Sequence, residues 1–374
     1  MSLSYVTLGR LTGLRVSEFA LGTSNFGTTP AARTDLAEAR AIVDTYAAAG
    51  GNFIDTADAY GHGTSEEVVG QALAGCRDDF VLATKFTRTP TPGAGAAATG
   101  NSRRSAIRSL EASLGRLRTD HVDLFWVHLP DRVTPTDEIL ATFGELVRAG
   151  KIRYGGLSNF PAWRVAAAAT TDRLSGPGTA LVAVQDEYSL AHRDADAELI
   201  PAAEAFGLGA CLYAPLAGGL LTGKYRLTGP AGPAGPNGPA GPAGPNSTAC
   251  GTPEEDGGRL GAWGAGVRAE VSAQQTAILD TLTAVAEDLD STPARVAVAW
   301  LAERAQRSAT ALVPVIGPRT TGQLRDYLAA LDLRLPPARY DQLSEVSAGP
   351  GQPGLEIAFG GEAGRFRRHP VPVI

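Results

Sequence analysis

The sequence contains few of the features that would link it to a disulfide framework, a membrane or a nucleic acid. Its 374 residues include only three cysteines, which are spaced too widely for a disulfide framework or a metal-ligand cluster. No uninterrupted apolar run reaches the ~18 residues of a membrane span, and the opening segment MSLSYVTLGR lacks the apolar stretch of a signal peptide. Acidic residues exceed basic ones, 39 against 33, so the net charge of −6 argues against a nucleic-acid surface. We therefore expect a cytoplasmic protein in a reducing compartment.

The rest of the composition is typical of a globular α/β protein. Apolar residues make up 44% of the chain, which is enough to bury a sizeable core. Short β-rich runs alternate with helical patterns, and several are almost continuously apolar, as expected for strands covered on both faces. The candidate strands lie at residues 19–23, 52–56, 80–84, 122–128, 154–158, 181–185, 209–213 and 311–316. Eight strands that alternate with helices predict a single (β/α)8 TIM barrel over residues 1–374.

A doubly wound sheet is the alternative fold. That fold favours the pattern G-x-G-x-x-G after an early strand, and the LGTSNFG of residues 21–27 departs from it. Within the barrel, the periodicity predicts helices over residues 36–50, ending at Gly50, and over 102–117, with Ser102 as the N-cap. Two short β-like runs within residues 4–17 predict an N-terminal hairpin.

Two long segments interrupt the alternation of strands and helices. Residues 87–101 form a Pro/Gly/Ala-rich loop after the third strand, on the face expected to carry the active site. Residues 229–246 consist of six Gly-Pro-Ala or Gly-Pro-Asn triplets. We interpret them as part of a mobile surface insertion at about 227–258 that favours polyproline II, with a folded lid as the alternative. A C-terminal tail is expected from about residue 336.

Four polar side chains lie at or just after the carboxyl ends of three successive predicted strands. Asp55 ends the second strand and Tyr60 follows in its loop, whereas Lys85 and His128 end the third and fourth strands. Because barrel enzymes build their active sites at this face, the four side chains are expected to converge on one rim. Each also has an ordinary alternative role, as a turn cap, a loop aromatic, a solvated lysine or a hydrogen-bonded core histidine. Their joint position favours a catalytic role.

The chemistry of these four groups is complementary. A phenol with a pKa near ~10 is a weak acid at neutral pH, and a nearby ammonium such as that of Lys85 stabilises its phenolate. An isolated lysine in a pocket tends to lose its proton, and Asp55 is able to hold it charged. His128 is able to donate a hydrogen bond to a substrate oxygen. Together the four groups are suited to protonating a carbonyl oxygen while hydride arrives at the carbon, with Tyr60 as the general acid.

Sequence blocks over nearly the whole chain resemble those of the aldo-keto reductases. They are GGNFIDTADAYG, VLATKF, VDLFWVH, GKIRYGGLSNF, VQDEYSL, YAPLAGGLLTGKY and VPVIGPRTTGQL, and they occur in the order found in that family. The resemblance implies a barrel fold, NADPH or NADP+ as cofactor without a Rossmann domain, and a catalytic tetrad of Asp55, Tyr60, Lys85 and His128. No metal site is implied.

The resemblance also implies which residues hold the nicotinamide end of the cofactor. Ser158, Asn159 and Gln185 would bind the carboxamide, since hydroxyl and amide groups suit a neutral partner that both donates and accepts. Tyr213 would stack against the ring. Strand-end capping by the polar residues and core packing of the tyrosine are the alternatives. The expected contacts of this half are completed by Gly22, Thr23 and Asp55.

For the phosphate and adenosine half, the resemblance points to the last two strands. Leu216, Gly218 and Lys224 would contact the pyrophosphate, and Gly317 would lie nearby. Arg319 and Gln323 would hold the adenosine 2′-phosphate and the adenine, because an arginine fork suits a phosphate. A solvated Arg319 is the alternative.

Two positions depart from the pattern of this family. Ala214 stands where many relatives have serine, and Tyr327 where they commonly have asparagine. The first change removes one side-chain hydrogen bond to the phosphates, and the second leaves the adenine contact open.

The substrate pocket is the least matched part of the chain. His62 is expected to line it, and so is Trp126, which faces the same side of its strand as His128. Packing inside the barrel is an equal alternative for Trp126. The style of the blocks resembles the bacterial branch that acts on sugars or secondary-metabolite ketones.

These observations predict NADPH-dependent reduction of an aldehyde or ketone, with a small-molecule carbonyl compound as the partner. One alternative is a cofactor-binding regulatory subunit that resembles the β subunits of potassium channels. Another is an NADP-assisted sugar epimerase or dehydratase. Neither a membrane nor a nucleic-acid partner is expected, and a homo-oligomer is compatible with the sequence.

Overall fold

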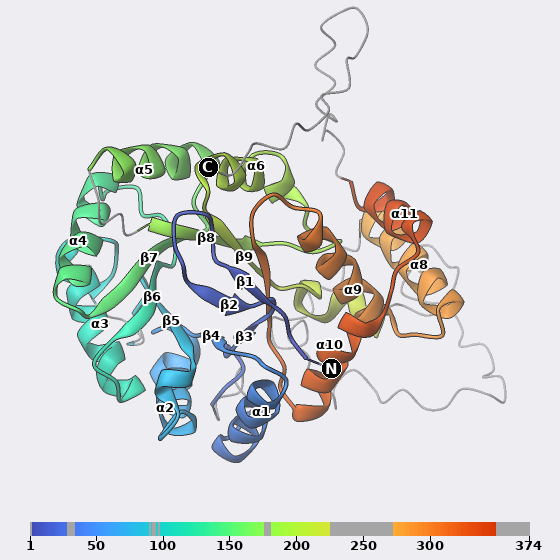
Figure 1. Ribbon diagram of the computed structural model, residues 1–374, viewed down its shortest axis with the longest axis horizontal. Coiled ribbons are helices and arrows are strands. Elements are labelled where there is room, and N and C mark those ends of the chain that lie inside the picture. The colour runs from blue at the N-terminus through green and yellow to red at the C-terminus, as the bar shows by residue number, and fades with distance from the viewer. Residues whose placement is uncertain are drawn as a thin grey trace, which may run out of the picture.

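The protein folds as one closed barrel of eight parallel strands, which confirms the TIM-barrel prediction (Figure 1). The structure is a computed structural model that describes residues 2–27, 34–89, 91, 95, 98–175, 181–224 and 272–348. The barrel strands are β3 (Ala20–Gly22), β4 (Phe53–Asp55), β5 (Val81–Phe86), β6 (Val122–Val127), β7 (Ile152–Ser158), β8 (Leu181–Glu187), β9 (Gly209–Tyr213) and β10 (Leu312–Ile316). They pair in chain order, and β10 closes the barrel against β3. Each strand overlaps one of the eight segments predicted from the sequence.

The barrel strands are apolar on both faces because both faces are covered. In β4, Phe53 belongs to the cluster inside the barrel, whereas its neighbour Ile54 packs into the cluster between the barrel and the helices. All residues of β3, β4, β5 and β10 are buried. The almost continuous apolar runs in the sequence are the direct consequence of this double burial.

A ring of helices surrounds the strands. It comprises α1 (Leu36–Ala48), α2 (Thr64–Ala72), α3 (Arg103–Leu117), α4 (Thr136–Arg148), α5 (Ala162–Leu174), α6 (Leu199–Phe206), α9 (Pro293–Gln306) and α10 (Thr321–Ala329). As predicted, the Ser102 side chain caps α3, accepting a hydrogen bond from the backbone of Ser105. Gly50 takes a positive φ of 87° just after α1, which is a conformation that glycine adopts without strain. The described residues also contain short 3-10 turns: η1 (Tyr60–Gly63), η2 (Arg77–Asp79), η4 (Asp194–Asp196), η5 (Ala217–Thr222) and η7 (Ala330–Asp332).

The predicted hairpin is formed by β1 (Tyr5–Thr7) and β2 (Arg15–Ser17), which are antiparallel. Leu8 and Val16 are fully buried and belong to the same apolar cluster as Phe53 and Val313 at the amino ends of the barrel strands. The hairpin therefore covers the amino-terminal mouth of the barrel and leaves the carboxyl-terminal mouth for chemistry.

Two further helices lie outside the ring, beside α9, at the right of Figure 1. They are α8 (Ala273–Asp288) and α11 (Pro337–Ser347), so the segment expected to be a tail from about residue 336 begins with a helix. Trp300 of α9 joins this layer to the barrel, since its ring stacks between Tyr188 and Tyr340 at centroid distances of 6.1 and 6.2 Å.

Some predictions fall on residues outside this description. They include the insertion at about 227–258 and the tail beyond residue 348. Within the residues that the structure describes, no helix is long and apolar enough to cross a membrane.

Candidate active site

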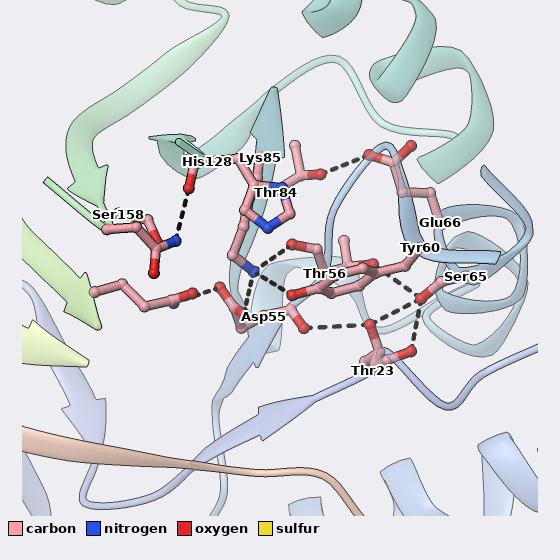
Figure 2. Close-up of polar contacts among 12 residues, drawn as sticks. Thr23, Asp55, Thr56, Tyr60, Ser65, Glu66, Thr84, Lys85, His128 and Ser158 are labelled. Carbon is pink, nitrogen blue, oxygen red and sulfur yellow. Dashed lines mark hydrogen bonds and ion pairs between the residues drawn. The ribbon is translucent and has the colours of Figure 1, made fainter. Parts of the chain in front are cut away.

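Lys85, at the end of β5, is the centre of a buried polar cluster at the carboxyl-terminal mouth (Figure 2). Its Nζ atom forms an ion pair with the Asp55 carboxylate from the neighbouring strand β4. The same atom donates hydrogen bonds to the Thr56 carbonyl oxygen at 2.9 Å and to the Tyr60 phenolic oxygen at 3.2 Å. Asp55, Tyr60 and Lys85 are thus brought into direct contact, in the arrangement that the sequence analysis expected.

Electrostatics keep Lys85 charged in spite of its burial. Its side chain is fully buried, and this burial by itself lowers the pKa of the ammonium group. The negative charge of Asp55 and the contact with Tyr60 outweigh burial, so the net effect is a raised pKa of Lys85. Asp55 is in turn fixed from the far side of the barrel, because the Gln185 amide donates to its other carboxylate oxygen at 3.2 Å. The cluster therefore presents a fixed positive charge to Tyr60.

A tight turn after β4 carries Tyr60 back toward Lys85. The backbone N–H of Tyr60 donates to the Ala57 carbonyl, and Gly61, His62 and Gly63 then follow with φ values of 52°, 57° and 94°. Glycine adopts such values without strain, whereas His62 is a non-glycine residue in the left-handed region. The two glycines that bracket His62 are thus explained by this turn. The His62 side chain is exposed.

His128 lies beside Tyr60 on the same rim. Its backbone N–H donates to the Phe86 carbonyl at 2.9 Å, and its ring meets the Tyr60 ring edge-on at a centroid distance of 5.9 Å. Burial, together with the positive charges of Lys85 and Arg88, lowers the pKa of His128 to about 3. The imidazole is therefore neutral near pH 7. Its Nδ1 atom is buried and has no hydrogen-bond partner among the described groups.

The residues expected to hold the carboxamide form a second network on the next strands. Asn159 has a positive φ of 60°, and its Nδ2 atom donates to the His128 carbonyl at 2.8 Å and to the Ser158 hydroxyl at 3.0 Å. The Tyr213 hydroxyl donates to the Asn159 side-chain oxygen at 2.8 Å, and the Asn159 backbone N–H donates to the Gln185 carbonyl. Burial, followed by the nearby acidic residues, raises the pKa of Tyr213, so its phenol is neutral. Ser158, Asn159, Gln185 and Tyr213 therefore lie together.

A cavity of about 510 Å³ opens beside the Lys85 cluster. This volume is within the ~300–1,000 Å³ typical of ligand sites. Twelve residues named in the sequence analysis border it: Gly22, Asp55, Tyr60, Tyr213, Ala214, Leu216, Gly218, Lys224, Gly317, Arg319, Gln323 and Tyr327. The cavity thus runs from the Lys85 cluster along the ends of β9 and β10 to α10.

Other predicted residues lie elsewhere. Ser158, Asn159 and Gln185 adjoin the cluster but are not part of the described cavity lining, and neither is His62. Thr23 is fully buried and its hydroxyl contacts the Ser65 hydroxyl at 3.0 Å. Trp126 is fully buried in the cluster inside the barrel, which is the packing alternative that the sequence left open.

Hydrogen bonds hold together the two ends of the loop between β5 and α3. Thr87 has a φ of 113°, which is a rare conformation for a β-branched residue. Its hydroxyl donates to the Asn101 side-chain oxygen at 2.6 Å, and its carbonyl accepts from the Gly100 N–H at 2.8 Å. The Asn101 amide also donates to the Leu129 carbonyl, beside His128. Both ends of the loop are therefore fixed close to the site.

Several residues of the cavity were not found from the sequence. Ser24 and Asn25 border it, and the Asn25 amide donates to the Gly317 carbonyl at 2.8 Å. Arg295 of α9 and Asp326 of α10 also border it and form an ion pair of 2.6 Å. These two residues are 31 positions apart in the chain, and no local motif marks the pair.

The fold and the site define a TIM barrel in which a buried cluster of Asp55, Tyr60 and Lys85 adjoins a large cavity at the carboxyl-terminal mouth. The family model described as "Aldo/keto reductase family" matches residues 18–348. The chain belongs to that family.

Individual relatives agree with this assignment. The chain is 36% identical to the uncharacterized oxidoreductase YrpG of Bacillus subtilis, over 93% of this chain and 97% of that protein. It is 31% identical to norsolorinic acid reductase stcV of Emericella nidulans, over 94% and 83% of the two chains. It is also 35% identical to a probable voltage-gated potassium channel subunit beta of Oryza sativa, over 60% of this chain and 67% of that protein.

Proposed function

We propose that the protein reduces an aldehyde or ketone to the alcohol, using NADPH, with Tyr60 as the general acid. The observation that supports this most directly is the position of Tyr60. Its phenolic oxygen accepts a hydrogen bond from Lys85, and the residue also borders the large cavity. The Tyr60 hydroxyl, a proton donor that is hydrogen-bonded to the buried Lys85 ammonium, therefore borders a space able to hold a cofactor and a substrate.

In this proposal each member of the cluster has a distinct task. Bound NADPH supplies a hydride. Tyr60 gives its hydroxyl proton to the carbonyl oxygen, and the ammonium group of Lys85 stabilises the phenolate that remains. Asp55 keeps Lys85 charged and in place. His128, which is neutral, positions the carbonyl oxygen through a ring N–H.

The cavity residues suit a dinucleotide. Gly218 and Gly219 have φ values of 67° and 104°, so the chain bends tightly there and offers its backbone without side chains in the way. Lys224 and Arg319 border the same cavity and match the charge of phosphate groups. We assign the nicotinamide end to the Tyr213 and Asn159 network and the adenosine end to Arg319 and Gln323. The preference for NADPH over NADH rests on Arg319.

The substrate class is inferred from the relatives. The name of stcV states that it reduces norsolorinic acid, and by likeness we propose a keto-sugar or a secondary-metabolite ketone for this protein. A regulatory subunit is a second candidate, because the rice relative is named as a channel subunit. The complete cluster around Lys85 favours catalysis.

The decisive experiment follows NADPH oxidation with a panel of aldehydes, keto-sugars and polyketide-type ketones. Stoichiometric loss of NADPH supports reduction, whereas binding without turnover over the whole panel favours the regulatory candidate. Tyr60→Phe should still bind NADPH and should lose turnover by about 10²–10⁴-fold. Unchanged turnover of this variant would remove Tyr60 from the acid role.

A further inference from the structure

We propose that Arg295, on α9, binds a phosphate group of the dinucleotide in the large cavity. This inference rests on the proposed use of NADPH and adds a residue that lies outside the phosphate segment of residues 214–224 and the adenosine segment around Arg319. It assigns to α9 a direct part in holding the cofactor.

The position of Arg295 is the first argument. Ala294, Arg295 and Val298 all border the cavity, so the beginning of α9 forms one of its walls. Gly223 and Pro293 lie close together, since a Cβ atom added to Gly223 would lie 4.0 Å from Pro293. The guanidinium group extends from this wall to Asp326 on α10. Arg295 thus lies between the proposed pyrophosphate segment and the proposed adenosine end.

The unused hydrogen-bonding capacity of Arg295 is the second argument. Its Nη2 atom donates to Asp326 at 2.6 Å. Its Nε atom is buried, and no acceptor for it exists among the residues that the structure describes. A buried donor without an acceptor is unfavourable, so the contact with Asp326 does not by itself satisfy the hydrogen-bonding groups of this guanidinium. A guanidinium group offers several N–H donors in a plane, and therefore it can keep Asp326 and also receive a phosphate oxygen.

The charge balance of the cavity is the third argument. Apart from Asp55, which is paired with Lys85, the charged residues in the described lining are Lys224, Arg295, Arg319 and Asp326. Three cations therefore face one acid. These three basic side chains are of the type that suits the pyrophosphate or the 2′-phosphate of a dinucleotide.

The alternative is that Arg295 serves only the ion pair with Asp326. Both side chains are well exposed, at 39% and 61%, and exposed pairs contribute little to stability. Arg295→Gln should therefore fold normally with an almost unchanged melting temperature. A loss of cofactor affinity in this variant can then be attributed to a missing contact with the ligand.

The test measures binding rather than turnover. Dissociation constants of NADPH, NADH, 2′-AMP and ADP are determined by calorimetry for the full-length wild type, Arg295→Gln and Arg307→Gln. Arg307 is a matched control, because it lies at the end of α9, is similarly exposed and pairs with Glu303 instead of lining the cavity. Arg295→Gln should weaken NADPH binding by about tenfold or more, and Arg307→Gln should not.

The ligands distinguish the two phosphate sources. Weakening of NADPH and 2′-AMP alone assigns Arg295 to the 2′-phosphate, and equal weakening of NADPH, NADH and ADP assigns it to the pyrophosphate. Wild-type affinity of Arg295→Gln for all four ligands overturns this inference and leaves the proposed reductase intact. Failure of the wild type to bind either dinucleotide overturns both.

Discussion

The carboxyl group of Asp58 accepts a hydrogen bond of 2.8 Å from the Ser109 hydroxyl, which joins the turn before Tyr60 to helix α3. Asp58 is fully buried, and its Oδ1 atom lacks a partner within the described part of the chain. Burial is the main reason why the pKa of Asp58 rises to about 7, with Glu66 on α2 adding to the shift and Ser109 and Arg116 on α3 opposing it. This carboxyl group therefore titrates in the folded protein near neutral pH.

The raised pKa of Asp58 predicts a pH-dependent effect of Asp58→Asn on stability. Between about pH 4 and pH 7 the unfolded chain gives up the proton of Asp58 while the folded protein keeps it. The wild type should therefore lose stability from this group as the pH rises through that range. Asp58→Asn cannot titrate, so relative to the wild type it should gain on the order of 4 kcal/mol between pH 4 and pH 8.

Urea denaturation of both proteins at several pH values measures this difference. Other titrating groups occur in both proteins and cancel in the comparison. A stability difference that stays constant over the whole pH range would show that folding does not shift the pKa of Asp58.

The ion pair of Lys85 and Asp55 predicts a strong coupling between two substitutions. Lys85→Met leaves a carboxylate buried without its cation, which costs about 3–5 kcal/mol of stability. The double variant Asp55→Asn/Lys85→Met removes both charges and should recover most of that loss. Neither variant should reduce carbonyl compounds, because Tyr60 no longer has a cation beside it.

Thermal melting and NADPH turnover are measured for Asp55→Asn, Lys85→Met and the double variant. If the stability losses of the two single variants add up to the loss of the double variant, the two side chains act independently. Substantial turnover by the folded double variant would remove Lys85 from the proposed chemistry.

Much of the fold follows from local sequence patterns. Apolar runs mark the eight strands because the strands are covered on both faces, and Ser102 caps its helix through a contact with Ser105, only three residues away. The position of Asp55, Lys85 and His128 at strand ends follows from the parallel order of the barrel. Such features are predictable since they depend on residues close in the chain or on one rule of the fold.

Other features depend on contacts between residues far apart in the chain, which no local sequence pattern predicts. Asp58 precedes Tyr60 by two residues, but its partner Ser109 is 51 residues away. Glu66 is fully buried and accepts hydrogen bonds from Thr84 at 2.6 Å and from Arg116 at 2.7 Å. Both carboxyl groups look like ordinary polar positions in the sequence. Only the packing of α2 and α3 on the barrel determines their burial and their partners.

The low pKa of His128 predicts the pH profile of reduction. The imidazole is neutral far below pH 7, so it should not contribute an ionisation between about pH 5 and pH 8. His128→Gln keeps a hydrogen-bond donor and should lower kcat/KM by about tenfold or less, whereas His128→Ala should lower it by about 10²–10³-fold. The profiles of the wild type and His128→Gln should have the same shape. An acid limb near pH 6 that disappears in His128→Gln would instead show that protonation of this ring matters.

The close packing of Gly156 against Trp126 predicts that adding one methyl group at Gly156 lowers the stability of the protein. The two residues are partners on β7 and β6, and a Cβ atom at Gly156 would lie 2.3 Å from the indole ring. Trp126 is fully buried and packed within the apolar cluster inside the barrel. Gly156→Ala should therefore destabilise the protein by about 1–3 kcal/mol and change the tryptophan fluorescence.

Gly115→Ala is the matched control for this substitution. A Cβ atom at Gly115 would meet nothing within 4 Å, and the residue lies in α3. Alanine is the better helix former, so this variant should be stabilised by about 0.5–1 kcal/mol. Urea denaturation that finds Gly156→Ala as stable as the wild type would mean that Trp126 can shift. The packing around Trp126, two residues before His128, would then be loose enough to accept an added methyl group.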